Sequence, residues 1–481
     1  MDTLLIVSVS IIAVALVSLM VVGAVPDGLW GRLSGKRFID VWLQKAVADL
    51  GGGDDLAGYH AYLKTLPSFR LADLHRALDA LGESTGAEAR LDSDHHETLA
   101  LILAGQFNNE RNRTVRASGS VGRAVAEGKD AFFPTDTFRV VRLGAEAPPA
   151  IFRLRFDTYT QSARIEVGAT SQDDAEAVME RILTTASEVS VYRGKTLEVS
   201  FESDIRDEYG DAVQGEFVDL RFRPTYRIEE DEIILEPEKR ALLDRLLVDF
   251  YARRAALRDL GLPSRRGVLF YGPPGTGKTH TCKYLAHRLD GVTTLVATGR
   301  TLLHARSICQ IARMLQPALV VLEDVDLVYG QREENAYGVA LGELMDELDG
   351  FARDDEILFV LTTNAIDRVE AAVKDRPGRI SQCVLFGLPG PDLRRRYLTA
   401  LLAPYDTSGL DLGEVVRMTD RTSQAFLKEL VFRSVQIATE AEGASEPAAV
   451  RLGVAHVREA LDEMKAGAGR EGAAILGFQV A

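Results

Sequence analysis

The sequence predicts an α/β protein whose C-terminal half forms a parallel β-sheet with flanking helices, followed by a helical lid. Two observations carry this prediction. A glycine-rich segment separates a strand-like apolar run, 267–271, from a helix-like run, 280–286. Two further apolar runs, 318–322 and 357–363, each end in polar side chains. Uninterrupted runs of this length are typical of strands that are buried on both faces of a parallel sheet.

The N-terminal segment 4–25 predicts a transmembrane helix that anchors the protein in a membrane. Residues 4–25 contain no charged side chain, and about 22 helical residues at 1.5 Å each reach roughly 33 Å, enough to cross a bilayer core. Asp2 precedes this run, whereas Arg32, Lys36 and Arg37 follow it. The positive-inside rule therefore places the body of the protein on the cytoplasmic side, or on the matrix side of a mitochondrial membrane. A cleaved signal peptide is the alternative, but the run is long and lacks a basic start.

The segments between this anchor and the glycine-rich loop predict two small regions. Residues 36–117 carry apolar side chains at three- and four-residue spacing, which predicts a helical region. Residues 130–230 alternate apolar with polar side chains around one helix at 173–185, which predicts a small α+β domain. The alternation would place Arg153 and Arg155 on the solvent face of the sheet. An α/β core at 237–390, a helical lid at 391–465 and a tail at 466–481 complete the predicted organisation.

Composition argues against several functional classes. The chain has 481 residues and a formal net charge of −15, so it lacks the overall basic character typical of nucleic-acid-binding proteins. Its three cysteines show no C-x-x-C spacing, which argues against a disulfide framework or a structural zinc site. The expected compartment is therefore reducing.

The glycine-rich segment has the spacing G-x-x-x-x-G-K-[ST] and predicts a nucleotide site. Glycines at fixed positions let backbone N–H groups approach a phosphate chain, and the following helix directs its positive end at the same point. The lysine can neutralise the β- and γ-phosphates, and the final hydroxyl can hold Mg²⁺. The predicted ATP-binding residues are Gly272, Pro273, Pro274, Gly275, Thr276, Gly277, Lys278 and Thr279.

Further candidate residues follow in chain order. The strand at 318–322 ends in Glu323 and Asp324, and such a strand can supply one carboxylate near Mg²⁺ and one that orients an attacking water. The strand at 357–363 ends at Asn364, whose amide could reach the γ-phosphate. Arg376 and Arg379 could reach a neighbouring subunit's nucleotide as arginine fingers in a ring-forming enzyme.

Together these four motifs resemble the AAA family of ring-forming ATPases over residues 237–470. The resemblance implies hydrolysis of ATP with Mg²⁺ in a homo-oligomeric ring of about six or seven subunits. It implies that Thr279 and Glu323 hold the metal, that Asp324 orients water, that Asn364 senses the γ-phosphate, and that Arg376 and Arg379 act on the neighbouring subunit.

Two departures narrow the resemblance. The usual Asp-Glu strand end is reversed to Glu323-Asp324, and the segment 298–307 lacks the aromatic residue of peptide-threading members. With the N-terminal anchor, these features resemble the mitochondrial Rieske-protein translocase type. The expected function is remodelling or translocation of a protein client. The alternatives are an ATP-gated membrane scaffold with little turnover and a membrane-tethered ATPase that remodels DNA.

Overall fold

The structure is a computed structural model, and it divides the chain into two compact units. The first comprises Met1–Val191 and Phe201–Asp219, and the second comprises Tyr192–Ser200 and Leu220–Ala481. The residues described here are 38–53, 55–81, 83–88, 90–91, 98–106, 115–116, 119–143, 147–158, 160–202, 217–224, 228, 232–329, 347, 352, 355–367, 380–442 and 446–466. The predicted anchor 4–25 and almost all of the predicted tail 466–481 lie outside these residues.

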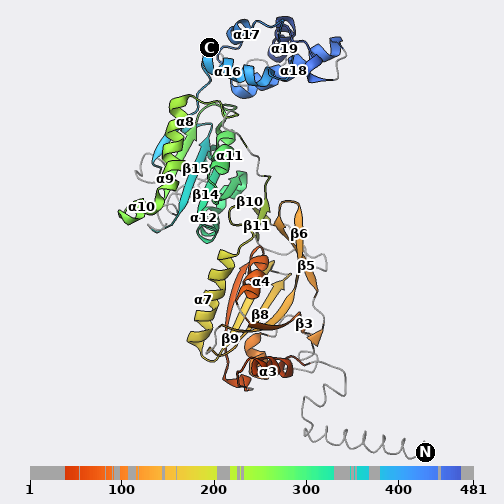
Figure 1. The fold of residues 1–481 in the computed structure, drawn as a ribbon, viewed down its shortest axis with the longest axis vertical. Helices are drawn as coiled ribbons and strands as arrows, with labels where there is room; N and C mark the ends of the chain where they lie inside the picture. Colours follow the sequence, from red (N-terminus) through yellow and green to blue (C-terminus); the bar gives the residue numbers. More distant parts are fainter. Residues whose placement is uncertain are drawn as a thin grey trace, which may run out of the picture. The chain divides into compact units, whose positions relative to one another are not determined.

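A five-stranded sheet in the order β1-β9-β8-β7-β2 forms the centre of the first unit (Figure 1). All four neighbouring pairs in this sheet are antiparallel. The strands are β1 His60–Pro67, β2 Glu83–Glu88, β7 Asp136–Arg142, β8 Ala150–Asp157 and β9 Ser162–Ala169, and the main helices are α3 Ile39–Asp49, α4 Arg70–Ala80, α5 Leu99–Leu103 and α7 Gln172–Glu188. A separate two-stranded ribbon consists of β5 Ser120–Ala126 and β6 Lys129–Pro134.

Helices pack against both faces of this sheet. Leu74 of α4 and Ile182 of α7 share one apolar core with Phe152 and Leu154 of β8. Helices α3 and α5 share a second core with Ile151 of β8 and with β7. Strand β8 is therefore buried along its whole length.

This two-sided cover corrects one prediction from the sequence. Arg153 and Arg155 were expected on a solvent face, but Arg153 is 2% exposed and Arg155 is 8% exposed. The guanidinium of Arg153 donates to both carboxylate oxygens of Asp136, at 3.1 and 2.9 Å, and lies 3.9 Å from Glu166. Burial of this kind requires paired charges, which the two carboxylates provide.

The region 36–117 also differs from its prediction. It contains α3, α4 and α5, but it supplies two strands to the sheet as well. Strand β1 pairs with β9 and strand β2 pairs with β7. Strands β1 and β2 of this region therefore belong to the sheet of the α+β unit.

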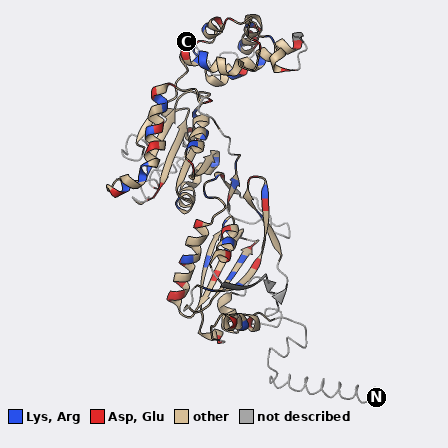
Figure 2. Cartoon of the chain, in the orientation of Figure 1, with Lys and Arg blue, Asp and Glu red and all other residues tan. Residues whose placement is uncertain are grey.

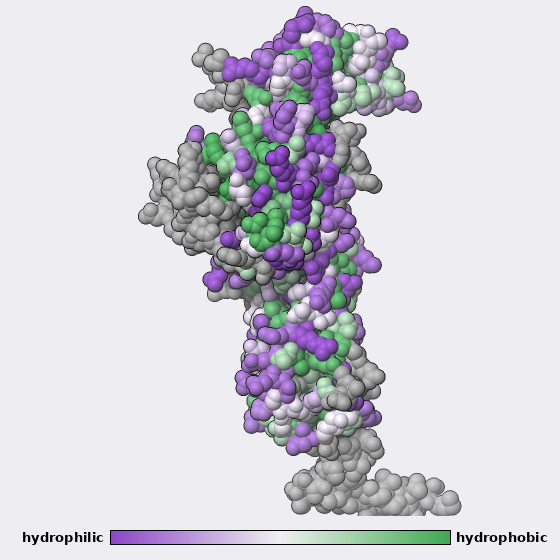
Figure 3. Space-filling view, turned by 60° about the vertical axis from the view of Figure 1, so that its left-hand side comes forward, coloured by the Kyte–Doolittle hydropathy of each residue, from purple (hydrophilic) through white to green (hydrophobic). Residues whose placement is uncertain are grey.

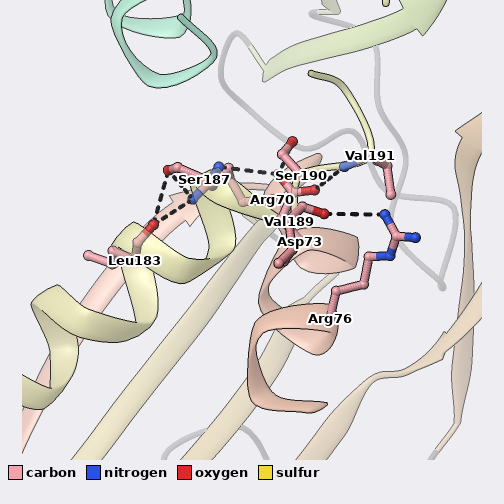
Figure 4. A network of polar contacts seen from close by, with 8 residues as sticks. All are labelled: Arg70, Asp73, Arg76, Leu183, Ser187, Val189, Ser190 and Val191. Atoms are coloured by element: carbon pink, nitrogen blue, oxygen red, sulfur yellow. Dashed lines mark hydrogen bonds and ion pairs between the residues drawn. The ribbon is translucent and has the colours of Figure 1, made fainter. Parts of the chain in front are cut away.

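A polar network holds the residues just before the chain first leaves the first unit (Figure 4). Asp73 on α4 accepts hydrogen bonds from the Val191 amide at 2.9 Å and from the Ser190 hydroxyl at 2.8 Å. Arg70 lies 3.2 Å from the same carboxylate, and Arg76 donates to the Val189 carbonyl. These bonds fix the segment after α7 to α4.

Two buried carboxyl groups and one buried histidine in this unit have shifted pKa values. Burial raises the pKa of Asp73 and of Glu166, although neighbouring arginines oppose both shifts. Burial lowers the pKa of His75 to about 4, and its ring stacks on Phe133 with centroids 5.2 Å apart. Of these groups, His75 makes the folded unit less stable in acid, because the unfolded chain takes up its proton first, whereas the raised pKa values of the two carboxyl groups act in the opposite direction.

The second unit contains a seven-stranded sheet in the order β11-β10-β13-β14-β15-β12-β16, with helices on both faces (Figure 1). The neighbouring pairs from β10 to β16 are all parallel. The strands are β10 Thr196–Glu202, β11 Phe217–Phe222, β12 Arg266–Tyr271, β13 Thr293–Thr298, β14 Ala318–Glu323, β15 Ile357–Thr363 and β16 Gln382–Leu385. The prediction of a parallel-sheet α/β core is confirmed.

Strands β10 and β11 extend this parallel sheet, whereas the sequence placed them in the α+β domain. Thr196 of β10 lies opposite Thr294 of β13 in a parallel register. The leucine and valine of β10 are buried, because this strand is covered like its parallel neighbours.

The helices of the second unit form two groups. Those around the sheet are α8 Pro237–Leu243, α9 Asp249–Ala252, α10 Arg254–Asp259, α11 Lys278–Arg288, α12 Ala305–Met314 and α13 Val325–Tyr329. Those of the lid are α16 Pro391–Leu402, α17 Leu412–Met418, α18 Gln424–Glu442 and α19 Val454–Ala466. The lid has its own apolar core, which includes Leu398, Phe426 and Leu461.

The surface is mixed in charge and polarity. Figure 2 shows basic and acidic residues interleaved along α8, α9 and α10, and Figure 3 shows apolar patches broken by hydrophilic residues on the face it presents. Within the described parts of the chain, no helix is both long enough and apolar enough to cross a membrane.

Candidate nucleotide site

The glycine-rich loop joins β12 to α11. Gly272, Gly275 and Gly277 all have positive φ angles, of 145°, 75° and 92°. A Cβ atom on Gly272 would also collide with the Phe386 carbonyl oxygen, so this position requires glycine on two grounds. Thr276 closes the loop from within, since its hydroxyl donates to the Pro273 carbonyl at 2.8 Å.

Lys278 is the first residue of α11 and is buried at the base of this loop. Its ammonium donates to the carbonyl oxygens of Gly272 and Pro273 at 2.8 and 2.9 Å, and to Asn364 Oδ1 at 2.8 Å. Burial lowers the pKa of Lys278, and the carboxylates of Asp324 and Asp326 oppose that shift. The lysine thus has three hydrogen bonds that a phosphate group would have to replace.

The sheet register brings the predicted polar residues to one edge. Tyr271 of β12 lies opposite Thr363 of β15, and Leu322 of β14 lies opposite Leu361. Asp324 follows the end of β14 and Asn364 follows the end of β15, so these two residues meet at the site. Asn364 Nδ2 donates to Asp324 Oδ1 at 3.0 Å, so Lys278, Asn364 and Asp324 form a continuous chain of hydrogen bonds.

Asp326 organises this edge, and the sequence prediction assigned it no role. It is 4% exposed, and its Oδ1 accepts from the Thr363 hydroxyl at 2.7 Å and from the Asn364 amide N–H at 2.9 Å. The Asp324 amide in turn donates to the Thr362 hydroxyl at 3.0 Å. The sequence offered one signal for this role, a carboxylate two residues after Asp324. A buried carboxylate requires hydrogen-bond donors, and the Thr363 hydroxyl and the Asn364 amide supply them here.

A cavity of about 700 Å³ opens over this edge, and the lid contributes to its wall. The loop residues from Pro274 to Thr279 line it together with Asp324 and Asn364. The lid provides Tyr397, Leu401 and Ala425, among others, and the Ala425 amide donates to the Gly275 carbonyl at 3.1 Å. One end of the cavity is therefore rich in amide donors, and the other has apolar walls suited to a base.

The two adjacent acids do not line the same cavity. Asp324, which has a positive φ of 52°, borders the cavity above the loop. Glu323 borders a second cavity beside Cys282 and Lys283 of α11. Of the predicted metal ligands, Thr279 lines the first cavity, whereas Glu323 is not among its described lining residues.

The oxygen donors at this edge suit a hard cation. The Thr279 hydroxyl and the carboxylate of Asp324 border one cavity, and Mg²⁺ takes one or two such groups with phosphate oxygens. Within the described segments there is no group of three or more His, Cys, Asp or Glu residues that could hold a metal by itself. Arg376 and Arg379 lie outside the described residues, so their placement stays a prediction.

Comparisons with known proteins agree with this geometry. Residues 268–388 match the family model described as ATPase family associated with various cellular activities (AAA). A 26S proteasome regulatory subunit 8 homolog of Schizosaccharomyces pombe is 29% identical, over 35% of this chain and 46% of its own length. The ATP-dependent zinc metalloprotease FtsH of Mycoplasmoides gallisepticum is 27% identical, over 51% of this chain and 33% of its own.

A probable mitochondrial chaperone bcs1 of Schizosaccharomyces pombe is 30% identical, over 41% of this chain and 45% of its own length. The chain thus spans half or less of the length of each of these three relatives. The family match begins within β12 and runs past β16, so it includes the glycine-rich loop, Asp324 and Asn364.

Proposed function

Since this chain carries an ATPase domain of the AAA family, we propose that it is a membrane-anchored enzyme that hydrolyses MgATP in a homo-oligomeric ring. The observation that carries this proposal is the hydrogen-bonded chain Lys278–Asn364–Asp324 beneath a glycine-rich loop, in one cavity with apolar walls at its other end. Such a site can hold a phosphate chain and orient a water molecule.

The roles of the residues follow from their positions. The loop amides and Lys278 bind the phosphates, and Thr279 holds the Mg²⁺ that arrives with the nucleotide and screens its charge. Asp324 accepts a hydrogen bond from the attacking water, while Asn364 fixes both Asp324 and the γ-phosphate. For Lys278 to reach a phosphate it must release Asn364, which then becomes available to the nucleotide.

We further propose that Arg376 and Arg379 complete the site of a neighbouring subunit, with about six or seven subunits in the ring. This part rests on the sequence motif and on the family resemblance. A site that needs the neighbour's arginine couples hydrolysis to assembly.

The anchor and the client complete the proposal. Residues 4–25 would hold the ring on a membrane with the ATPase domain on the cytoplasmic or matrix side. Relatives named as a chaperone and a protease support a protein client that is remodelled or translocated.

An ATP-gated scaffold with little turnover is the second candidate. It is favoured by the reversed Glu323-Asp324 pair and by the hydrogen bond that already engages Asp324 Oδ1. In that case nucleotide binding would control assembly without productive hydrolysis.

Phosphate release in detergent, measured against protein concentration, distinguishes the two. The parent is compared with Lys278→Ala, Asp324→Asn, Arg376→Ala and Arg379→Ala. A specific activity that rises cooperatively with concentration and is lost in all four variants supports the ring enzyme. Binding of ATP without turnover, with assembly that still follows nucleotide, refutes hydrolysis and supports the scaffold.

A further inference from the structure

A second cavity, of about 460 Å³, lies within the second unit and is lined by residues of α11 and of strands β10, β11, β13 and β14. Its floor consists of side chains from three neighbouring strands, and α11 and β11 form its walls. The described lining residues include Cys282 and Ala286 of α11, Thr294 and Val296 of β13, and Val321 of β14. Nothing in the proposed hydrolysis of ATP uses this space.

The floor and the rim of this cavity differ in chemistry. Cys282, Thr294, Val296 and Val321 are all at most 7% exposed, so the floor is buried and mainly apolar. The rim carries basic side chains, which the exposed residues Lys283 and Arg221 provide together with Arg223. A floor and rim of this kind match a ligand with an apolar body and an anionic group.

Acidic side chains also line this cavity, and they are fewer than the basic ones. Glu198 forms an ion pair with Arg223, with 3.1 Å between Oε2 and Nε. Glu323 is the other carboxylate of the lining. The described lining thus carries three Arg or Lys side chains and two Glu side chains.

The two cavities share the same two elements. Thr279 and Thr281 of α11 line the nucleotide cavity, whereas Cys282, Lys283 and Ala286 of the same helix line the second one. At the end of β14, Asp324 lines the nucleotide cavity and Glu323 lines the second one. A molecule in the second cavity would therefore press on the helix that carries Lys278 and on the residue next to Asp324.

We propose that the second cavity binds a small organic anion with an apolar or aromatic body, and that its occupancy alters nucleotide affinity through α11 and the end of β14. Binding at this place does not depend on the proposed hydrolysis. Coupling between the sites is reciprocal, so the anion and the nucleotide change each other's affinity by one common factor.

Anilinonaphthalene sulfonate is a suitable probe, because it joins an aromatic body to one anionic group and fluoresces in apolar surroundings. Saturating MgADP is present throughout, so that the nucleotide cavity is filled. Ala286→Phe fills the second cavity, and Asp290→Phe, at an exposed position beyond α11, is its control. Lys283→Gln removes one rim charge, and Lys465→Gln removes an exposed charge on α19.

We expect about one probe molecule per chain, with at least about a tenfold loss of affinity in Ala286→Phe and a two- to fivefold loss, roughly, in Lys283→Gln. Both control variants should bind as the parent does. Absence of binding, or binding that neither cavity variant weakens, would overturn the site. Circular dichroism and retained MgADP binding show that the variants fold, and Lys283→Gln tests the site even if Ala286→Phe does not.

Calorimetric titration with MgADP, with and without the probe, tests the coupling. The expected result is at least about a twofold change in nucleotide affinity in the parent and none in Ala286→Phe. Probe binding without any such change refutes the coupling and leaves the site. Because this measurement needs no turnover, its failure is distinct from a failure of the proposed ATPase activity.

Discussion

Replacement of Asp326 by alanine should slow hydrolysis by displacing Asn364. The carboxylate accepts two hydrogen bonds at one oxygen, from the Thr363 hydroxyl and the Asn364 amide N–H. Hydrogen bonds to a charged acceptor contribute about 1.5–3 kcal/mol each, and a buried donor left without a partner costs about 1–3 kcal/mol. Thr363 is fully buried, whereas Asn364 is exposed and can turn to water.

The expected loss of folding stability in Asp326→Ala is therefore about 2–4 kcal/mol. If the free energy of the hydrogen bond from the Asn364 amide to Asp326 is what holds Asn364 beside Asp324, its loss should lower kcat about 10- to 100-fold. KM should change little, because the glycine-rich loop and Lys278 remain. Asp326→Asn keeps an acceptor oxygen in the same place and should recover most of the rate.

The assay is phosphate release at saturating and limiting ATP, with thermal unfolding and MgADP affinity measured on the same samples. A parent-like kcat in Asp326→Ala would refute the positioning role. An Asp326→Asn variant as slow as Asp326→Ala would show that charge, and not hydrogen bonding, is what matters. A rise in KM at constant kcat would move the effect to nucleotide binding.

Three further predictions concern the loop, acid stability and the thiols. Gly272→Ala should unfold or strongly destabilise the second unit, as measured by thermal melting. Gly277→Ala has open space around its Cβ and should lower the stability by only about 1–2 kcal/mol through backbone strain. An equal loss of stability in the two variants would contradict this prediction. His75 has a pKa of about 4 in the fold against 6.5 unfolded, so the unfolded chain gains its proton first and stability should fall by up to about 3 kcal/mol from pH 6.5 to 4. His75→Gln should remove this decrease of the unfolding free energy with falling pH, as measured by denaturant titrations. The same decrease in parent and variant would be evidence against the role of His75. The two buried carboxyl groups with raised pKa act in the opposite direction in both proteins. Cys383 is exposed while burial raises the pKa of Cys309 to about 12, so a thiol reagent should label one cysteine quickly in the folded chain and three after denaturation.

The sequence was sufficient for the parallel-sheet core because its signals are local there. The apolar runs of β12, β14 and β15 are continuous, and the loop motif follows directly after one of them. Each strand end then placed Asp324 and Asn364 at the same sheet edge, since parallel strands share it.

The rest depended on contacts that no local pattern records. Strand β1 pairs with β9, so His60 meets Ala169 across a long stretch of chain. Its pattern is that of a mostly exposed edge strand, which resembles a loop in composition. The solvent-exposed position predicted for Arg153 is wrong. Alternation of apolar and polar residues indicates a solvent-exposed sheet face only when no helices cover that face, and here α3 and α5 cover it.

The candidate site shows the same division. Lys278 and its loop are fixed by spacing, but the contribution of the lid is not. Ala425 meets Gly275 only through the packing of α18, and Asp326 acquires its donors only when β14 and β15 lie side by side. A residue's role that depends on contacts between distant segments of the chain can be recognised only from the structure.

The division of the chain into units has a consequence for its biosynthesis. The path enters the second unit at Tyr192, returns to the first at Phe201, and leaves it again after Asp219. Strand β10 therefore emerges from the ribosome well before β13, the strand that it must join, and the nascent chain holds an unpaired edge during that interval. A truncation that begins at Pro237 would remove β10 and β11 and leave the edge of β13 permanently unpaired, so the ATPase domain should be excised with residues 192–236 retained if it is to stay free of aggregation.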